Sequence, residues 1–85
     1  MKHILIICLN ELRCRRAMQR AFEKLGGEAT CKVTSGIIET ADETYHFRAP
    51  YKERLMGMEV QEIMFDEDVL PEDKDMVRAY VRIKK

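Results

Sequence analysis

The sequence predicts an α/β fold: a small, layered β-α-β-β-β-α-β-α domain whose mixed sheet includes an antiparallel hairpin. The apolar run at residues 3–9 is nearly continuous, which is typical of a strand covered on both faces. Apolar residues then recur at helical spacing over residues 11–25. Two extended segments, residues 36–40 and 44–48, flank a short polar turn and predict the hairpin. The strand-to-helix junction favours a parallel core, and we expect one domain over residues 1–85.

The first helix has clear signals at both ends. Asn10 is a good N-cap residue, and Glu11 places a carboxylate in the first turn, where the helix dipole favours it. Gly26 and Gly27 end the helix, because glycine readily adopts the left-handed conformation that follows a last helical turn. One apolar stripe predicts the buried face of this helix: Cys14, Met18, Ala21, Phe22 and Leu25.

The middle of the chain predicts extended structure followed by a short helix. Residues 29–33 are expected to form a second strand, with a turn or a bulge at residues 34–36 before the hairpin. Pro50 turns the chain out of sheet pairing and suits the first position of a short helix through Met56. Gly57 ends that helix.

The last third of the chain predicts a strand and a final helix. Residues 59–65 form an apolar-rich strand that ends in three consecutive acids. Leu70 and Pro71 open the last helix, which has acids in its first turn and basic residues at its end. Residues 81–83 either complete this helix or form a short edge strand.

The charges balance in total but are unevenly distributed. Fifteen Lys and Arg residues match fifteen Asp and Glu residues, so the composition implies no general attraction to nucleic acid or membrane. Residues 1–24 nevertheless hold six Lys or Arg against two acids, and residues 59–75 hold eight acids against one Lys. This split gives the surface an electrostatic direction.

The three cysteines, Cys8, Cys14 and Cys31, form no C-x-x-C motif. We interpret them as small apolar residues in a reducing compartment. The apolar run at residues 4–9 is too short for a signal sequence or a membrane span. The sequence therefore predicts an intracellular, cytoplasmic protein.

A basic stripe follows the first helix at helical spacing. It consists of Arg13, Arg16, Arg20 and Lys24. Such a stripe is usually a solvated helix face, and its functional interpretation is contact with phosphates or with an acidic partner. Arg15 lies at the edge of the stripe.

An acidic loop follows the strand at residues 59–65. It consists of Asp66, Glu67 and Asp68. Carboxylate oxygens suit Mg²⁺ or Ca²⁺, so Asp66 and Glu67 are the candidate metal ligands. No cofactor is predicted apart from Mg²⁺ at these two residues. The alternative is a solvated loop whose like charges face water. No Ser/His/Asp or Cys/His arrangement stands out, so no catalytic residue is predicted.

Part of the chain resembles the Walker-B half of phage terminase large subunits and related helicase-like ATPases. The resemblance rests on the extended residues 35–47, on Arg54-Leu55-Met56-Gly57, which is similar to that family's Arg-Leu-x-Gly turn, and on the strand that ends at Asp66-Glu67. It covers residues 35–67. It implies that Asp66 matches the metal-associated acid and Glu67 the catalytic acid, and it suggests a phage or prophage origin.

The chain departs from that family at the phosphate site. It contains no G-x-x-x-x-G-K-[ST] motif, and Leu9-Asn10-Glu11-Leu12-Arg13 follows the first strand where such a loop belongs. Glu11 stands where phosphates need bare backbone amides. We therefore do not expect this chain to hydrolyse ATP on its own.

These observations favour a small non-enzymatic interaction protein with a degenerate ATPase-like core. Its partner would be another protein or a second copy of the chain, in a homodimer, and no membrane association is expected. The alternative is a nucleic-acid-binding accessory protein that uses the basic stripe. A metal-dependent hydrolase centred on Asp66 and Glu67 ranks last.

Overall fold

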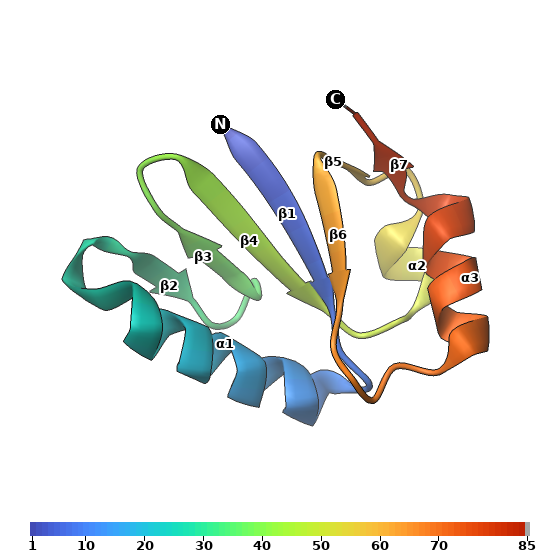
Figure 1. Ribbon diagram of the computed structural model, residues 1–85, viewed down its shortest axis with the longest axis horizontal. Helices are drawn as coiled ribbons and strands as arrows, with labels where there is room; N and C mark the ends of the chain where they lie inside the picture. Colours follow the sequence, from blue (N-terminus) through green and yellow to red (C-terminus); the bar gives the residue numbers. More distant parts are fainter. Residues whose placement is uncertain (85) are drawn as a thin grey trace.

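The computed structural model describes residues 1–84 and confirms the α/β class, with a mixed sheet and helices (Figure 1). Its elements in chain order are β1 (Lys2–Ile7), α1 (Glu11–Leu25), the short 3₁₀ helix η1 (Gly26–Glu28), β2 (Thr30–Lys32), β3 (Ile37–Glu39), β4 (Glu43–Arg48), α2 (Lys52–Leu55), β5 (Glu59–Val60), β6 (Glu62–Phe65), α3 (Pro71–Tyr80) and β7 (Arg82–Ile83).

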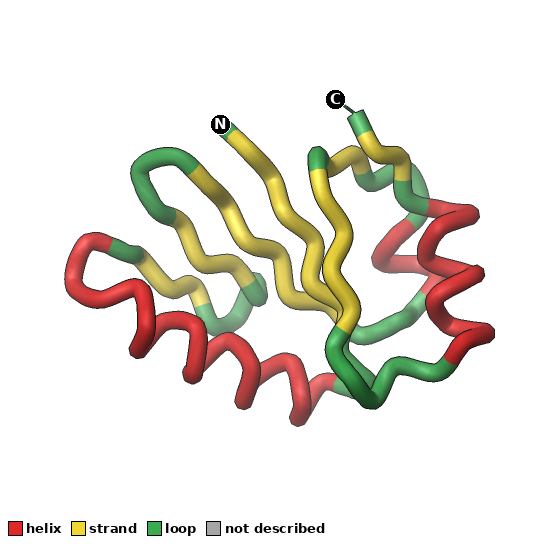
Figure 2. The backbone as a smooth tube through the Cα atoms, in the orientation of Figure 1, coloured by secondary structure: helices red, strands yellow, loops and turns green. Residues whose placement is uncertain are grey.

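The main sheet has five strands in the order β2-β3-β4-β1-β6 (Figure 2). β1 lies between β4 and β6 and is parallel to both, with Ile7 opposite Arg48 on one side and Phe65 on the other. β2, β3 and β4 are joined by antiparallel pairing, with Ile38 opposite Tyr45. The structure thus confirms a parallel core with an attached hairpin.

The central position of β1 follows from its two apolar faces. Leu5 and Ile7 are fully buried on one face, in a cluster with residues of α2 and α3 such as Leu55 and Val77. Ile6 packs on the other face, beside Cys8, which directly follows β1, in a cluster with Cys14 and Met18 of α1 and with Ile38 and Phe47 of the hairpin. Helices therefore pack on both faces of the sheet.

The helix α1 begins and ends where its sequence signals predict. The Asn10 side chain accepts a hydrogen bond from the Arg13 backbone N–H at 2.9 Å. Gly26 has a φ of +76°, and its N–H donates to the Phe22 carbonyl. Capping at both ends fixes the direction in which α1 leaves β1, and hence the position of its first turn.

The predicted strand at residues 59–65 is interrupted at Gln61. The Gln61 N–H still donates to the His3 carbonyl at 2.9 Å, while its side-chain Oε1 accepts the His3 N–H in place of a backbone carbonyl. The chain bends there, so β5 pairs with β7 in a separate two-stranded sheet and only β6 joins the main sheet. Residues 82–83 form a strand, one of the two predicted alternatives.

The short helix is smaller than the sequence predicts. Tyr51 has an extended backbone, with φ −103° and ψ 119°, and α2 begins only at Lys52. The Tyr51 N–H donates to the Ala49 carbonyl at 2.8 Å, which forms a tight turn around Pro50. This turn carries the chain from the end of β4 to the face of the sheet opposite α1.

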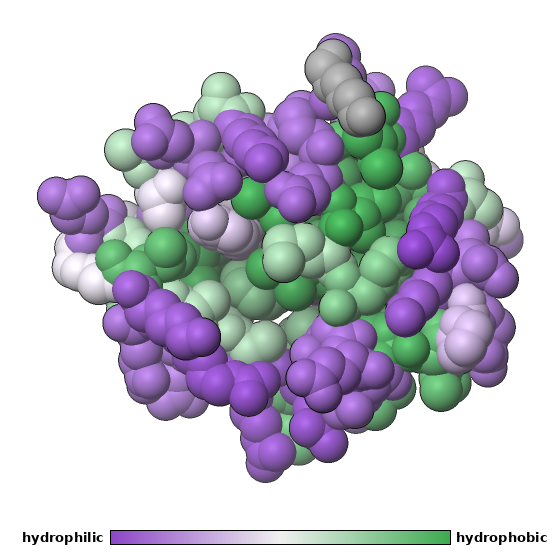
Figure 3. Space-filling view, in the orientation of Figure 1, coloured by the Kyte–Doolittle hydropathy of each residue, from purple (hydrophilic) through white to green (hydrophobic). Residues whose placement is uncertain are grey.

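The face seen in Figure 3 does not cover all of its apolar side chains with hydrophilic ones. Apolar side chains remain visible in the middle of this view, over the strands, with hydrophilic side chains around them. Met64 of β6 is among the exposed apolar residues, at 49% of its full exposure.

Candidate functional site: an arginine groove at the end of β4

A hollow lies at the carboxyl ends of β1 and β4. The chain leaves β1 into α1 on one face of the sheet and leaves β4 toward α2 on the other. In open α/β sheets, ligands bind at such points, where neighbouring strands send the chain in opposite directions. The hollow has a volume of about 660 Å³ and is called here the arginine groove; it is lined by Glu11, Cys14, Arg15, Met18, Val33, Thr34, Ser35, Gly36, Phe47, Arg48, Ala49 and Arg54.

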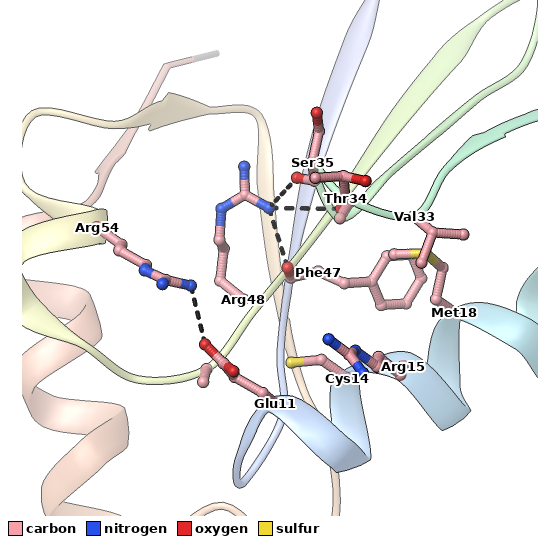
Figure 4. Close-up of a pocket in the computed structure, with 12 residues that line it drawn as sticks. Glu11, Cys14, Arg15, Met18, Val33, Thr34, Ser35, Phe47, Arg48 and Arg54 are labelled. Atoms are coloured by element: carbon pink, nitrogen blue, oxygen red, sulfur yellow. Dashed lines mark hydrogen bonds and ion pairs between the residues drawn. The ribbon is translucent and has the colours of Figure 1, made fainter.

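Arg48 is the central cation of the arginine groove (Figure 4). Its Nη1 donates to the Ser35 carbonyl at 2.9 Å and to the Phe47 carbonyl at 3.0 Å. Arg48 is half-buried, and none of the ion pairs within residues 1–84 involves it. Burial and the neighbouring Arg54 lower the pKa of the Arg48 guanidinium. A half-buried cation that makes no ion pair among the described residues is suited to receive an anionic ligand.

Gly36 allows the turn at residues 33–36 to approach Arg48. It has a φ of +67°, and its N–H donates to the Val33 carbonyl at 3.1 Å. A Cβ at this position would lie 2.8 Å from Arg48 Nη1 and 2.8 Å from the Phe47 carbonyl oxygen. Only glycine therefore fits both the backbone conformation and the space beside Arg48.

Arg54 and Glu11 meet at the same groove from opposite faces of the sheet. Arg54 belongs to α2 and Glu11 to the first turn of α1, and Arg54 Nη1 lies 3.1 Å from Glu11 Oε1. Both side chains are exposed. Figure 4 shows the two directed toward each other beside Arg48. Arg15, also on α1, is a third lining arginine and has no ion pair among residues 1–84.

The remaining lining of the groove is mixed, with the hydroxyl groups of the turn at residues 33–36 beside apolar side chains. Met18, Phe47 and Ala49 are buried, and Val33 is exposed at the rim. The groove therefore combines guanidinium groups with an apolar surface. This combination suits a ligand that has a phosphate at one end and an apolar or planar group at the other.

Two buried thiols lie beside the groove. The interaction with the Cys14 thiol raises the pKa of Cys8, and burial raises it further. The same interaction lowers the pKa of Cys14. Cys14 is therefore the more easily ionised of the two, and its side chain lines the groove.

The acidic loop lies at the end of β6, beside the end of β1. The Asp66 N–H donates to the Ile7 carbonyl at 2.9 Å, and Asp66 Oδ1 accepts the Glu67 N–H at 3.0 Å. Across residues 1–84, no three His, Cys, Asp or Glu side chains are grouped in a way that could hold a metal ion. The proposed role of Asp66 and Glu67 as metal ligands stays a prediction.

The basic stripe lies on exposed surface of α1. Arg13 contacts the acidic loop of its own chain, with its Nη1 3.5 Å from Asp68 Oδ2. The structure brings no acid within ion-pairing distance of the other three members among residues 1–84: Arg16, Arg20 and Lys24. Part of the charge asymmetry seen in the sequence is thus neutralised within one molecule.

The sequence alone does not predict the arginine groove. In the sequence, Arg54 belongs to the segment similar to an Arg-Leu-x-Gly turn, Arg15 lies at the edge of the basic stripe, and Arg48 ends the predicted hairpin. The available signal was an arginine at the end of a strand, with a glycine at the start of its antiparallel partner. That signal becomes informative only when β4 is known to be parallel to β1.

Comparisons with protein-family models, with curated proteins and with solved structures gave no match to this chain. Neither α1 nor any other helix within residues 1–84 has the length and apolar character needed to cross a membrane.

Proposed function

We propose that this protein is a non-enzymatic binding protein that holds a phosphate-bearing partner in the arginine groove. The observation that carries the proposal is Arg48, a half-buried guanidinium that contacts only backbone carbonyls among its described partners. Arginine is the cation best suited to phosphate, because its planar donors can contact two phosphate oxygens at once.

The position of the groove supports the same proposal. It lies at the carboxyl ends of two parallel strands and beside the first turn of α1, where helix dipoles favour negative charge. Arg15 and Arg54 add two more cations to the lining. The protein would act in the cytoplasm, with its cysteines reduced, as its three free thiols allow. A phage or prophage origin stays a prediction that depends on the terminase resemblance alone.

The test is a titration of the purified protein with phenyl phosphate, followed by the backbone amide signals in NMR spectra. We expect shifts at residues 33–36 and at the first turn of α1. Arg48→Gln should weaken binding at least tenfold, because a hydrogen bond to a charged group contributes about 1.5–3 kcal/mol. Arg16→Gln is the matched control, since it removes the same charge from the basic stripe. Equal loss in both variants, or no binding by the wild type, would contradict the proposal.

Nucleic-acid binding through the basic stripe is the second candidate. It is favoured by the exposure of Arg16, Arg20 and Lys24 and by the lack of carboxylate partners for them within residues 1–84. The measurement is the salt dependence of binding to a mixed DNA or RNA probe. Steep loss of affinity with salt supports this candidate, because phosphate contacts release counterions. Absence of binding at low salt would exclude it.

Self-association is the remaining partner proposal. β2 and β6 are the outer strands of the main sheet, and an outer strand can pair with a second copy. Light scattering at low and high salt measures it. A dimer that persists in high salt would indicate apolar burial or strand pairing, since exposed charge pairs are screened there. A monomer under both conditions, at tens of micromolar protein, would rule the dimer out.

A further inference from the structure

The ion pair between Glu11 and Arg54 spans the arginine groove. Its two members come from elements on opposite faces of the sheet, and both line the same hollow. Arg54 therefore has an anionic partner within its own chain, whereas Arg48 has none among residues 1–84. A ligand that uses Arg54 must first separate it from Glu11.

We infer that the Glu11–Arg54 pair is a latch on the arginine groove: Glu11 competes with the ligand for Arg54, and the groove takes a doubly charged phosphate monoester. This inference rests on the proposed function, because it concerns the same site. It specifies two things that the proposed function leaves open: the charge of the ligand, and Glu11 as the residue that opposes ligand binding.

The charges that line the groove favour a dianion. Arg15, Arg48 and Arg54 are offset only by Glu11, which leaves a net charge of plus two. A terminal phosphate carries between one and a half and two negative charges at neutral pH and three strong acceptor oxygens. A phosphodiester or a carboxylate carries one charge and leaves half of this excess uncompensated.

The latch can open at low cost. Both side chains are more than half exposed, at 61% for Arg54 and 54% for Glu11. Exposed ion pairs contribute little to stability, because water screens their attraction and ordering two long side chains opposes it. A dianion in contact with Arg48 would therefore draw Arg54 away from Glu11, and the separated Glu11 would then repel the bound ligand.

The latch makes a prediction that distinguishes it from a positioning role for Glu11. If Glu11 competes with the ligand, Glu11→Gln should tighten phenyl phosphate binding about threefold, or by less than about 1 kcal/mol, because exposed charges interact weakly. It should tighten binding of the singly charged methyl phenyl phosphate by a smaller factor. The difference follows because the repulsion that is removed scales with the charge of the ligand. If Glu11 instead holds Arg54 in place for the ligand, the same variant should bind both compounds more weakly.

The experiment measures the Kd values of both compounds by NMR titration for the wild type, Glu11→Gln and Glu23→Gln. Glu23→Gln changes the net charge equally on the same helix but outside the groove. Thermal unfolding of each variant verifies folding, and Glu11→Asp, which keeps the charge on a shorter side chain, should bind no more weakly than the wild type. Unchanged or weaker binding by Glu11→Gln would overturn the latch while leaving the groove intact. Failure of the wild type to bind either compound would overturn both proposals.

Discussion

On one side of the α1 N-terminus, Arg48 is half-buried and contacts backbone carbonyls, with no ion pair among residues 1–84. On the other side, Arg13 is exposed and lies 3.5 Å from Asp68 of the acidic loop. The two arginines differ in how much water surrounds them. The exposed Arg13–Asp68 pair is screened by water, and each charge already has a partner, so it needs no ligand. Arg48 is half-buried and makes no ion pair among residues 1–84, so it has a desolvation cost that a bound anion would offset. The arginine groove is therefore a better candidate binding site than the surface formed by Arg13 and the acidic loop.

The largest effect is expected from Gly36, which shapes the wall of the groove. Gly36→Ala should destabilise the protein by about 2–5 kcal/mol, since a left-handed backbone costs about 1–2 kcal/mol and overpacking against Phe47 and Arg48 adds about 1–3 kcal/mol. Urea unfolding of the variant measures this loss.

Gly57→Ala is the matched control for this effect. Gly57 also has a positive φ, +77°, but a Cβ there would meet no atom of residues 1–84 within 4 Å. It should therefore show only the backbone cost of about 1–2 kcal/mol. Equal losses in the two variants would mean that the close contact with Arg48 does not matter.

The next prediction concerns pH and uses His46, two residues before Arg48 on β4. Its Nε2 lies 3.0 Å from His3 Nδ1, and its own Nδ1 is buried without a hydrogen-bond partner within residues 1–84. Burial first, then Arg48 and His3, lower the pKa of His46 below its ordinary value of 6.5, and Glu39 opposes them with a smaller effect. The unfolded chain therefore binds more protons at mildly acidic pH.

The contribution of His46 to the free energy of unfolding should accordingly be fully present above about pH 6.5 and be lost as the pH falls below that value. Urea midpoints at pH 7.5 and 5.5 measure the change. His46→Gln should remove most of the contribution from this residue, and Arg48→Gln should reduce it, because one nearby positive charge is gone. An identical pH dependence in the wild type and His46→Gln would show that other groups cause the loss.

The sequence predicted the features that depend on neighbours along the chain. Asn10 and Gly26 act within one helix, and the buried run of β1 reflects its central position directly. The predicted buried stripe of α1 is only partly correct: Cys14 and Met18 are buried, but Phe22 and Leu25, near the end of the helix, are exposed at 37% and 38%. The hairpin was likewise predicted, because its two strands are adjacent in sequence. These elements and the α/β class follow from local patterns.

The features that were not predicted depend on pairing between distant segments. The groove exists because the end of β4 lies beside the end of β1, which brings Arg48 to the first turn of α1. The break at Gln61 depends on a side-chain contact with His3, 58 residues away. The contact between Arg13 and Asp68 could not be predicted from two separate charged segments. Neither propensity nor periodicity records such contacts.

A smaller effect on stability is expected for the ion pair between Arg13 and Asp68. In a double-mutant cycle with Arg13→Gln and Asp68→Asn, the coupling free energy should be below about 1 kcal/mol, because both side chains are close to half exposed. Thermal or urea unfolding of the four proteins gives this value. A coupling of several kcal/mol would mean that the charge of Arg13 is as poorly screened by water as that of half-buried Arg48, which would contradict the comparison between them.

The smallest effect is expected from divalent metal ions at the acidic loop. Asp66 Oδ1 already accepts the Glu67 N–H, and Asp68 is engaged by Arg13, so two of the three carboxylates have partners within the chain. A metal that bound the folded protein tightly would raise the melting temperature by linkage. We expect millimolar Mg²⁺ or Ca²⁺ to raise it by little or nothing in the wild type, with Asp66→Asn behaving the same. A clear rise that disappears in Asp66→Asn would establish Asp66 as a metal ligand, and would make the acidic loop, rather than the arginine groove, the first place to look for chemistry.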